Sequence, residues 1–457
     1  MLGTHHNREI GDPLGGRLLL TAAQMIRRSP SLRILGAIQN TPFLSREEIL
    51  AQQFRQLSQL LRVAESEVPY YREMFRSLRI KSRDIRNTDD FSKLPVLTKD
   101  IVRARRRDLI RENAPASQVI ERHSGGSTGT PLTFYCSKLT KVMSEAGTFR
   151  NLKQCGWRPG EMIGYFWGFD DRLNSLPKWR LHFEQMLRRN YQMDPFHSGP
   201  AELDLWFARW QRMQPRVALG YASTIARFAA RLESTGRTLP PVRGVFTTAE
   251  KLYPMHRSII ARVFGCPVYD CYGSGEVQNI AAECSHGRMH INSDYVLLEL
   301  DCSSPVMPDH GRPFLATSLC NDVMPFIRYR NEDCGELIED NCLCGNNFPL
   351  MDLKVSRISD NFVFPNGRVV HGEFFTHLVW GSEGIDNFQF HQTAPDVITL
   401  WFVPRPGDAM LRDRALLSAV ERVKALAPGH FITVNVREAD SISLSRAGKH
   451  RFTRTDV

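Results

Sequence analysis

A short loop of glycine and hydroxyl residues, HSGGSTGTP at 123–131, carries the clearest chemical signal in the chain. Glycine lets backbone amides approach a ligand closely, and serine and threonine hydroxyls add hydrogen-bond donors, so such a loop suits a polyphosphate. The loop is not a Walker A motif, because no lysine follows its last glycine. A cation that neutralises a bound polyphosphate must therefore come from elsewhere in the chain.

Four more motifs follow this loop in order. The first, YGSGE at 272–276, offers a tyrosine ring that can stack on a purine and a glutamate that can hold Mg²⁺. The second, RYRNED at 328–333, ends in an aspartate that can accept hydrogen bonds from ribose hydroxyls. SRISD at 356–360 and SRAGKHR at 445–451 complete the series. Taken singly, these motifs also have ordinary interpretations, such as a turn with a core tyrosine, a strand-edge ion pair or a surface lysine.

Cysteine and histidine offer a second kind of chemistry. Cys342 and Cys344 flank a single residue, and Cys284 and His290 form another pair upstream. Together they complete the donor set of a tetrahedral structural zinc site, with His286 as an alternative ligand. The spacing is not that of a standard zinc finger, so free thiols are the competing interpretation. The ten cysteines are scattered through a long chain without a secretory signal, which argues against a disulfide framework.

The helices and strands that must position these motifs are predicted to form an α/β fold. Apolar spacing predicts mostly helical structure over 46–112, starting after Ser45, and alternating strands and helices from about 115 to 330. The strands expected there are 217–220, 242–246, 267–269, 295–300 and 314–319. Ligands are expected at the carboxyl ends of such strands, where the turns 247–250 and 272–276 lie.

The last hundred residues predict a small α+β unit joined to the main body near 356–360. Its expected elements are a hairpin of 388–390 with 397–403, a helix at 411–426 and a strand at 431–436.

Length and composition set limits on the function. A chain of 457 residues with a net charge of +10 can form two or more domains and favours anionic partners. The densest basic run, 103–107, reads as a solvated helix face, and no basic motif interleaved with aromatics suggests nucleic-acid binding. No apolar run approaches the roughly 20 residues of a membrane span, and the start does not resemble a signal peptide. A cytoplasmic location is the expectation.

The five motifs in this order resemble the adenylate-forming superfamily of acyl-CoA synthetases, peptide-synthetase adenylation domains and luciferases. Within it, the chain looks most like the phenylacetate–coenzyme A ligase family and its capsule-biosynthesis relatives. The resemblance covers nearly the whole length and includes VPYY at 68–71 and LPVLTK at 94–99. It implies a large α/β N-terminal domain, 1–356, with a mostly helical segment at 1–112. A small mobile α+β domain, 357–457, would follow.

The resemblance also implies roles for individual residues. Those expected to bind ATP or AMP are Ser124, Ser127, Thr128, Gly129, Thr248, Ala249, Glu250, Tyr272, Ser274, Asp333 and Arg357. Within this set, the loop residues would grip the β- and γ-phosphates, Tyr272 would stack near adenine, and Asp333 would bind ribose. Glu276 would hold Mg²⁺. Lys449 would be the catalytic cation that the phosphate loop lacks.

Two departures from the family pattern lie at these motifs. Asn331 and Glu332 replace the threonine and glycine that usually precede the ribose-binding aspartate, and Ser356 replaces the glycine before Arg357. Both changes add side chains near the nucleotide or the hinge. They leave the main charged groups in place.

The expected function is that of an acid–thiol ligase with ATP, Mg²⁺ and coenzyme A. It would form an acyl-adenylate, release pyrophosphate and transfer the acyl group to coenzyme A. Pocket residues Trp167, Tyr221 and Val277 fit an aryl or medium apolar acid, although each is as readily a core residue. An amide or ester synthetase with an amine or hydroxyl acceptor is the first alternative. A non-catalytic basic binding protein on the same fold is the second. The sequence leaves the acid, the pathway and the oligomeric state open.

Overall fold

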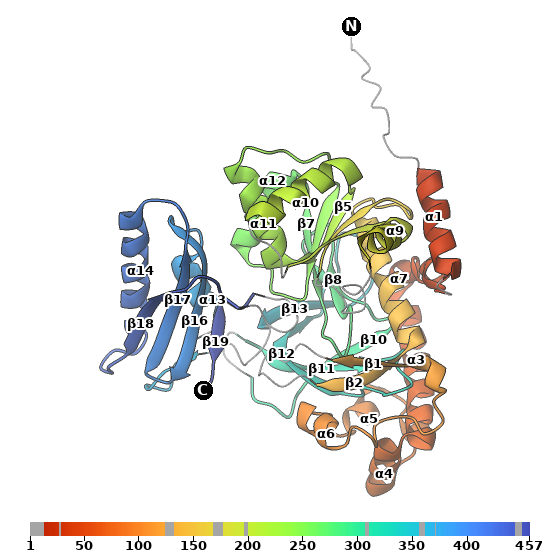
Figure 1. Ribbon diagram of the computed structural model, residues 1–457. Helices are drawn as coiled ribbons and strands as arrows, with labels where there is room; N and C mark the ends of the chain where they lie inside the picture. Colours follow the sequence, from red (N-terminus) through yellow and green to blue (C-terminus); the bar gives the residue numbers. More distant parts are fainter. Residues whose placement is uncertain are drawn as a thin grey trace.

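The computed structural model describes residues 13–26, 29–123, 132–167, 177–195, 200–306, 310–355, 362–370, 372–443 and 450–457. Its main body is built on a mixed sheet of eleven strands in the order β10-β11-β12-β13-β9-β8-β7-β6-β5-β3-β4 (Figure 1). The parallel part comprises β3 (Ile163–Phe166), β4 (Asn190–Met193), β5 (Val217–Tyr221), β6 (Gly244–Thr248) and β7 (Val268–Tyr272). The antiparallel part comprises β8 (Ala281–Glu283), β9 (Met289–Ile291), β10 (Val296–Leu300), β11 (Arg312–Ser318), β12 (Tyr329–Ile338) and β13 (Leu350–Val355).

Helices cover both faces of the parallel part, because its strands carry apolar side chains on both sides. One face packs against α10 (Pro200–Met213), α11 (Ala222–Ser234) and α12 (Pro254–Phe264). The other packs against α1 (Pro13–Ile26), α2 (Ser31–Ile38) and α7 (Lys138–Gln154), and α9 (Lys178–Arg188) leads into β4. Neighbouring residues of a strand point to opposite faces, so Val245 belongs to the first core and Phe246 to the second.

The antiparallel part packs against the N-terminal helices. These are α3 (Arg46–Glu67), α4 (Pro69–Leu78), α5 (Thr88–Ser92) and α6 (Lys99–Ala104), with short 3₁₀ turns η1 (Thr41–Phe43), η2 (Ser82–Asp84) and η3 (Ala116–Gln118). As the sequence predicts, Ser45 caps α3: its hydroxyl accepts from the amide of Glu48, whose carboxylate accepts from the amide of Ser45. The hairpin β1 (Val119–His123) and β2 (Thr133–Ser137) flanks the glycine-rich loop.

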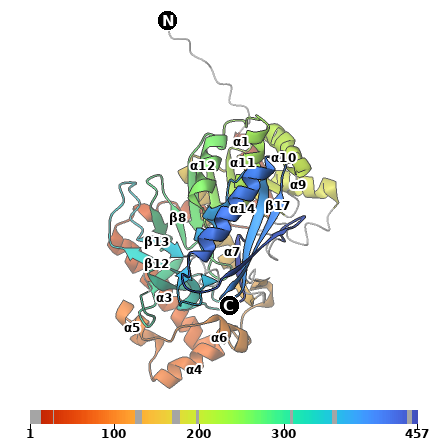
Figure 2. The same ribbon diagram turned by 90° about the vertical axis from the view of Figure 1, so that its left-hand side faces the viewer.

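The C-terminal unit, residues 362–457 as far as they are described, has its own sheet in the order β18-β17-β16-β19. Strands β16 (Ile385–Ala394) and β17 (Val397–Pro404) form the predicted hairpin, and β18 (Thr433–Glu438) and β19 (Thr453–Thr455) add in parallel. Helices α13 (Gly372–Val379) and α14 (Ala409–Lys424) and the ribbon β14 (Phe362–Val363) with β15 (Val369–Val370) complete it. Its aromatic core includes Phe375 and Phe390, and α14 lies on the side away from the main body (Figures 1 and 2).

The α/β class and the small second sheet are confirmed, with two corrections. The alternation of strands and helices ends at β7, because β8 to β13 are antiparallel and short turns suffice to join such strands. Strand β7 also runs to Tyr272, so the YGSGE motif begins inside a strand. Within the ranges that the structure describes, no helix is both long and apolar enough to cross a membrane.

Candidate functional site

The predicted nucleotide residues of the parallel part gather where its strands end. Thr248 is the last residue of β6, and Ala249 follows it with a φ of 68°, in the left-handed region that costs a non-glycine residue about 1 kcal/mol. The carboxylate of Glu250 accepts a hydrogen bond at 2.9 Å from the amide of Ser223, at the start of α11. An acidic group is favourable at a helix N-terminus. The turn after β6 is therefore fixed against the element that follows β5.

Tyr272 and Asp333, 61 positions apart in the chain, meet in a buried hydrogen-bond chain. The Tyr272 hydroxyl donates to Asp333 Oδ2 at 2.8 Å and accepts from the side-chain amide of Asn331 at 2.6 Å. Asn331 Oδ1 in turn accepts from the backbone amide of Asp333 at 3.2 Å. Burial and the adjacent Asp333 carboxylate raise the pKa of Tyr272 well above its usual value, so the hydroxyl keeps its proton. The carboxylate expected to bind ribose thus has a fixed orientation.

The structure accounts for Asn331 and Glu332, two of the three residues that depart from the family pattern, whereas Ser356 lies outside the described residues. Glu332 has a φ of 69°, so it takes the left-handed conformation that glycine prefers at this position. Its carboxylate pairs with the ammonium group of Lys99, from the LPVLTK segment. That segment also bonds to the start of β12, with the amide of Leu97 donating to Arg328 O at 3.1 Å and the amide of Arg330 donating to Leu97 O at 2.9 Å.

The motif after Tyr272 folds into a compact turn. The backbone amide of Ser274 donates to Val277 O at 2.8 Å, and the Ser274 hydroxyl accepts from Val277 N at 3.0 Å. Glu276 is only 6 % exposed, and one of its oxygens accepts from the Tyr329 hydroxyl at 3.3 Å. Its carboxylate has the hard-oxygen chemistry that suits Mg²⁺.

Two of the three expected pocket residues lie together. The rings of Trp167 and Tyr221 are 4.5 Å apart at 43°, next to the end of β5. Val277 is 1 % exposed and packs instead in the core beneath the antiparallel strands. Six further site residues fall outside the described ranges: Ser124, Ser127, Thr128, Gly129, Arg357 and Lys449.

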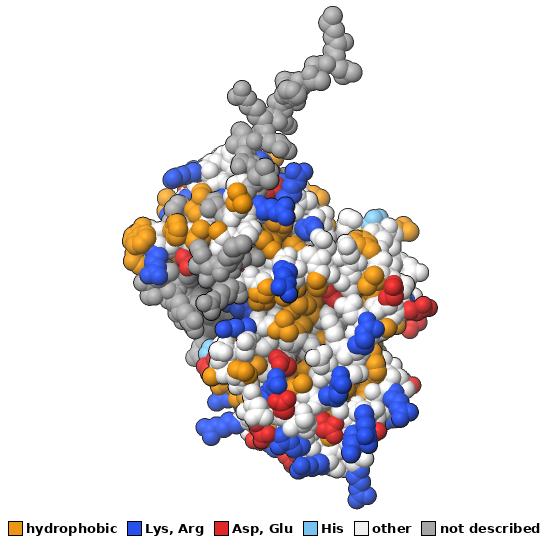
Figure 3. All heavy atoms as spheres, turned by 90° about the vertical axis from the view of Figure 1, so that its right-hand side faces the viewer, with side chains coloured by type: hydrophobic (Ala, Val, Ile, Leu, Met, Phe, Trp, Pro, Cys, Tyr) orange, Lys and Arg blue, Asp and Glu red, His pale blue; other side chains and the backbone are white. Residues whose placement is uncertain are grey.

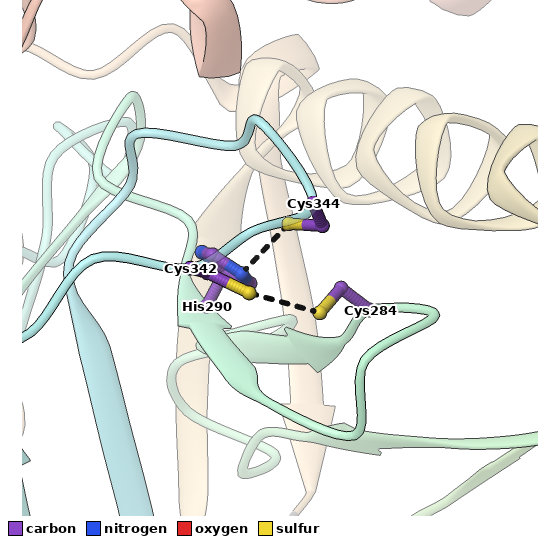
Figure 4. Close-up of side chains that lie close together, drawn as sticks. All are labelled: Cys284, His290, Cys342 and Cys344. Carbon is purple, nitrogen blue, oxygen red and sulfur yellow. Dashed lines mark hydrogen bonds between the residues drawn. The ribbon is translucent and has the colours of Figure 1, made fainter.

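The four predicted metal ligands converge between the β8–β9 hairpin and the loop that joins β12 to β13 (Figure 4). Their donor atoms lie within 4.8 Å of one another. Cys284 Sγ is 3.6 Å from Cys342 Sγ, and Cys344 Sγ is 3.3 Å from His290 Nε2. A tetrahedral zinc with bonds of about 2.3 Å to sulfur and 2.0–2.1 Å to nitrogen has ligand–ligand edges of about 3.8 and 3.6 Å. The donor set therefore fits a zinc ion.

The surroundings of the cluster favour metal binding. His290 Nδ1 donates to Phe348 O at 3.0 Å, which leaves Nε2 free of a proton and directed at the thiols. Backbone amides of His286 and Asn346 donate to Cys284 Sγ and Cys344 Sγ, both at 3.4 Å. Burial and the neighbouring thiols raise the pKa of Cys344 to about 12 in the metal-free cluster. For Cys342, hydrogen bonds from Cys344 and Cys284 outweigh burial and lower its pKa.

Comparisons with known proteins agree with the motifs. No protein-family model matches the chain. Protein CapK of Staphylococcus aureus is 22% identical over 358 residues, 73% of this chain and 74% of CapK. A phenylacetate-coenzyme A ligase of Thermus thermophilus is 25% identical over 363 residues, 76% and 78% of the two chains. The chain is a distant homologue of both and belongs to the adenylate-forming superfamily.

Solved structures show the same fold. A 2-hydroxyisobutyryl-CoA ligase in its postadenylation state, in complex with 2-HIB-AMP, matches with a TM-score of 0.70 at 20% identity, over 91% of each chain. The same ligase in its thioesterification state matches with a TM-score of 0.59 at 19% identity over the same share. Both comparisons show that this chain has the fold of that ligase.

Sequence reasoning did not identify Asn331 as a partner of Tyr272, nor Lys99 as the partner of Glu332. A signal for Lys99 was present, because it belongs to a segment that carries the family resemblance. Asn331 gave no such signal, since its role depends on the approach of β7 and β12 in space.

Tyr272→Phe is expected to lower the free energy of unfolding by about 1–3 kcal/mol, because Asn331 and Asp333 lose a buried hydrogen-bond partner. Chemical denaturation measures the change. Tyr70→Phe is the matched control: Tyr70 is half-buried and packs edge-on against Tyr71, and the change should stay within about 0.5 kcal/mol. Equal losses in the two variants would refute a special role for the Tyr272 hydroxyl.

Proposed function

We propose that the protein is an ATP-dependent carboxylic acid ligase that forms an acyl-adenylate and transfers the acyl group to coenzyme A. The observation that carries the proposal is the buried chain from Asn331 through Tyr272 to Asp333. It holds the carboxylate of Asp333, in β12, against Tyr272 at the carboxyl end of β7, and this class of fold binds its ligands at such strand ends. The match to a CoA ligase over nine-tenths of both chains supports the choice of reaction.

The first half-reaction joins two anions, and the proposed residues oppose their repulsion. An oxygen of the substrate carboxylate attacks the α-phosphorus of ATP, and the bond to the bridging oxygen of pyrophosphate breaks. Asp333 would accept hydrogen bonds from ribose, and Glu276 would hold Mg²⁺, which neutralises phosphate charge. Lys449 and the hydroxyls of the 124–130 loop would stabilise the charge that develops in transfer.

In the second half-reaction the acceptor thiol must reach the space that the catalytic lysine occupies during the first. The thiol sulfur of coenzyme A would attack the acyl carbonyl carbon, and AMP would leave with the bonding electrons. A lysine carried on the C-terminal unit can be withdrawn after the first step, which frees the site for the acceptor. The separate sheet and core of that unit make it suited to moving as a body.

The acid is proposed to be an aryl or medium apolar carboxylic acid. The tilted rings of Trp167 and Tyr221 next to the strand ends support this class, because aromatic walls remove apolar surface from water.

The cluster of Cys284, His290, Cys342 and Cys344 is proposed to hold a structural zinc ion. All four positions of a tetrahedron are taken by protein donors, so the ion would have no open position for substrate. Its proposed role is to fix the loop that joins β12 to β13.

The alternative of a non-catalytic basic binding protein on the same fold has less support. Arginines of the basic run 103–107 form ion pairs, with Arg103 bound to Asp100 and Arg105 to Glu73 and Asp108. On the face of the molecule that Figure 3 displays, acidic residues are interspersed with lysine and arginine.

Pyrophosphate release tests the proposal. Aryl, fatty and amino acids are screened with ATP and Mg²⁺, with and without coenzyme A. We expect acid-dependent release with at least one aryl or medium apolar acid, thioester only when coenzyme A is present, and loss of release in Asp333→Ala. An amide or ester formed in place of a thioester would reassign the acceptor. Absence of release with every acid, from a folded protein that binds ATP, would refute adenylation.

A further inference from the structure

His256 on α12 is fully buried, yet neither of its ring nitrogens finds a hydrogen-bond partner among the residues that the structure describes. A buried polar group without a partner destabilises a fold, so its presence calls for an explanation. It lies where the main body meets the C-terminal unit. Its ring packs against Trp380 at 4.4 Å and Phe452 at 5.9 Å from that unit, and against Tyr253 of its own segment at 5.6 Å.

This contact can form only around an uncharged ring. Burial, together with the nearby His450, lowers the pKa of His256 to about 3. His450 lies against Phe452 with ring centroids 4.3 Å apart, and its Nε2 is 3.1 Å from Phe388 O. Burial and the charge of Arg227 lower the pKa of His450 to about 4. Both imidazoles are therefore neutral while the two bodies are in contact.

The contact of His256 with Trp380 and Phe452 holds residues 450–452, near the C-terminus, against α12. Residues 450–452 directly follow Lys449, and Phe452 is 8 % exposed between the two bodies. Arg227 of α11 forms a second link across the contact, to Asp386 of β16 at 3.1 Å. Holding 450–452 against α12 limits the reach of the residue that precedes them.

We propose that His256, packed against Trp380 and Phe452, is a proton-sensitive latch that holds the C-terminal unit in this arrangement only while the imidazole is neutral. What the arrangement accomplishes rests on the proposed function: it restrains residues 450–452, which directly follow the proposed catalytic Lys449 in the sequence. His256 acts through the placement of Lys449 and is a positioning residue.

The charges around His256 do not offset its protonation. His450 faces it from the C-terminal unit and adds a second positive charge when protonated. On α12 and the preceding loop, Lys251 lies 5.9 Å from the Tyr253 ring centre. Two nearby acids are already paired, Asp386 with Arg227 and Glu283 with Arg257 on the β7 side. A proton on His256 would therefore be buried with His450 as the charged group that acts on it, and His450 opposes that proton.

The direction of the pH effect follows from the lowered pKa values. His256 binds a proton more readily when the C-terminal unit is separated from the main body than when the two are docked. Docking is therefore complete above the ordinary histidine pKa of about 6.5 and weakens as the pH falls below it. Between pH 7.5 and 5.5, each histidine that is neutral only when docked lowers the docking constant about tenfold. Only His256 contributes, because His450 keeps its contacts with Phe388 and Phe452, which lie in its own unit, when the bodies separate.

Hydrogen–deuterium exchange of the full chain without substrates tests the latch. Amide protection factors, corrected for the intrinsic pH dependence of exchange, are compared at pH 7.5 and 5.5 for α12 and residues 450–455. In the wild type we expect a fall of about tenfold, and in His256→Phe, which keeps a ring against Trp380, little or no fall. Protection of α3, remote from the contact, should not change and reports that the variant is folded.

Two further variants complete the test. His430→Phe removes an exposed histidine from the same unit and should behave as the wild type. Trp380→Ala removes the docking partner, so protection at the contact should already be low at pH 7.5. Equal falls in the wild type and His256→Phe, or no fall in either, would overturn the latch. Because no substrate is used, that result would leave the proposed ligase reaction unaffected.

Discussion

Lys449→Ala is expected to abolish acyl-adenylate formation while thioester formation from a supplied acyl-adenylate continues. The reason is the division of charge in the proposed site. The glycine-rich loop contains hydroxyls but no lysine, so the cation opposite the phosphates must come from a distant part of the chain. Removing one preorganised group that stabilises transition-state charge costs about 10²–10³-fold in rate. The second half-reaction has no such requirement.

The two half-reactions are measured separately, as acid-dependent pyrophosphate release and as thioester formed from synthetic acyl-adenylate and coenzyme A. Lys424→Ala, an exposed lysine at the end of α14, is the matched control and should alter neither rate. If both half-reactions fell equally in Lys449→Ala, or neither changed, Lys449 would not be the catalytic cation of the first step.

Much of the fold could be predicted because its signals are local. The strand at 217–220 and the Ser45 cap depend on residues within a few positions of each other, and the structure confirms both. The hairpin of β16 and β17 is likewise carried by two apolar runs around a short turn. The joining of the parallel and antiparallel parts into a single sheet could not be predicted, because β13 inserts beside β9 from sixty residues away.

The candidate site divides in the same way. The convergence of Cys284, His290, Cys342 and Cys344 could be predicted because cysteine and histidine are the donors that zinc prefers, so residue type alone points to the partners. The pairing of Tyr272 with Asp333 depends on how β7 approaches β12, and neither residue type implies the other. His256 could not be predicted at all, since its isolation is a property of two packed bodies rather than of the sequence around it.

Cys344→Ser is expected to remove one equivalent of bound zinc and to lower the free energy of unfolding by about 4 kcal/mol. At free zinc about a thousandfold above its dissociation constant, binding to the folded state alone contributes about this much. The loss should reach beyond the cluster. Asn347 of the same loop donates to Pro42 O at 2.7 Å through its amide and to Leu44 O at 2.9 Å through its side chain. The N-terminal helices are thus held against the loop that the proposed zinc ion would order.

The loop that joins β12 to β13 also contacts α7, so Cys344→Ser should affect that helix as well. The Arg150 guanidinium lies 5.2 Å from the centre of the Phe348 ring and forms a buried ion pair with Asp294 at 2.5 Å. The Phe348 carbonyl also fixes the tautomer of His290, so loss of the metal should loosen the contacts of this loop with the N-terminal helices and with α7.

Elemental analysis measures bound zinc, and chemical denaturation measures the free energy of unfolding. Cys302→Ser, which changes an exposed cysteine, is the control. Protein purified without metal, and equally stable in Cys344→Ser and Cys302→Ser, would show that the three cysteines of the cluster are free thiols. Chelation separates the two interpretations. If the cysteines are free thiols, a chelator leaves the free energy of unfolding unchanged; if they bind zinc in a closed tetrahedral site, a chelator lowers it by as much as Cys344→Ser does.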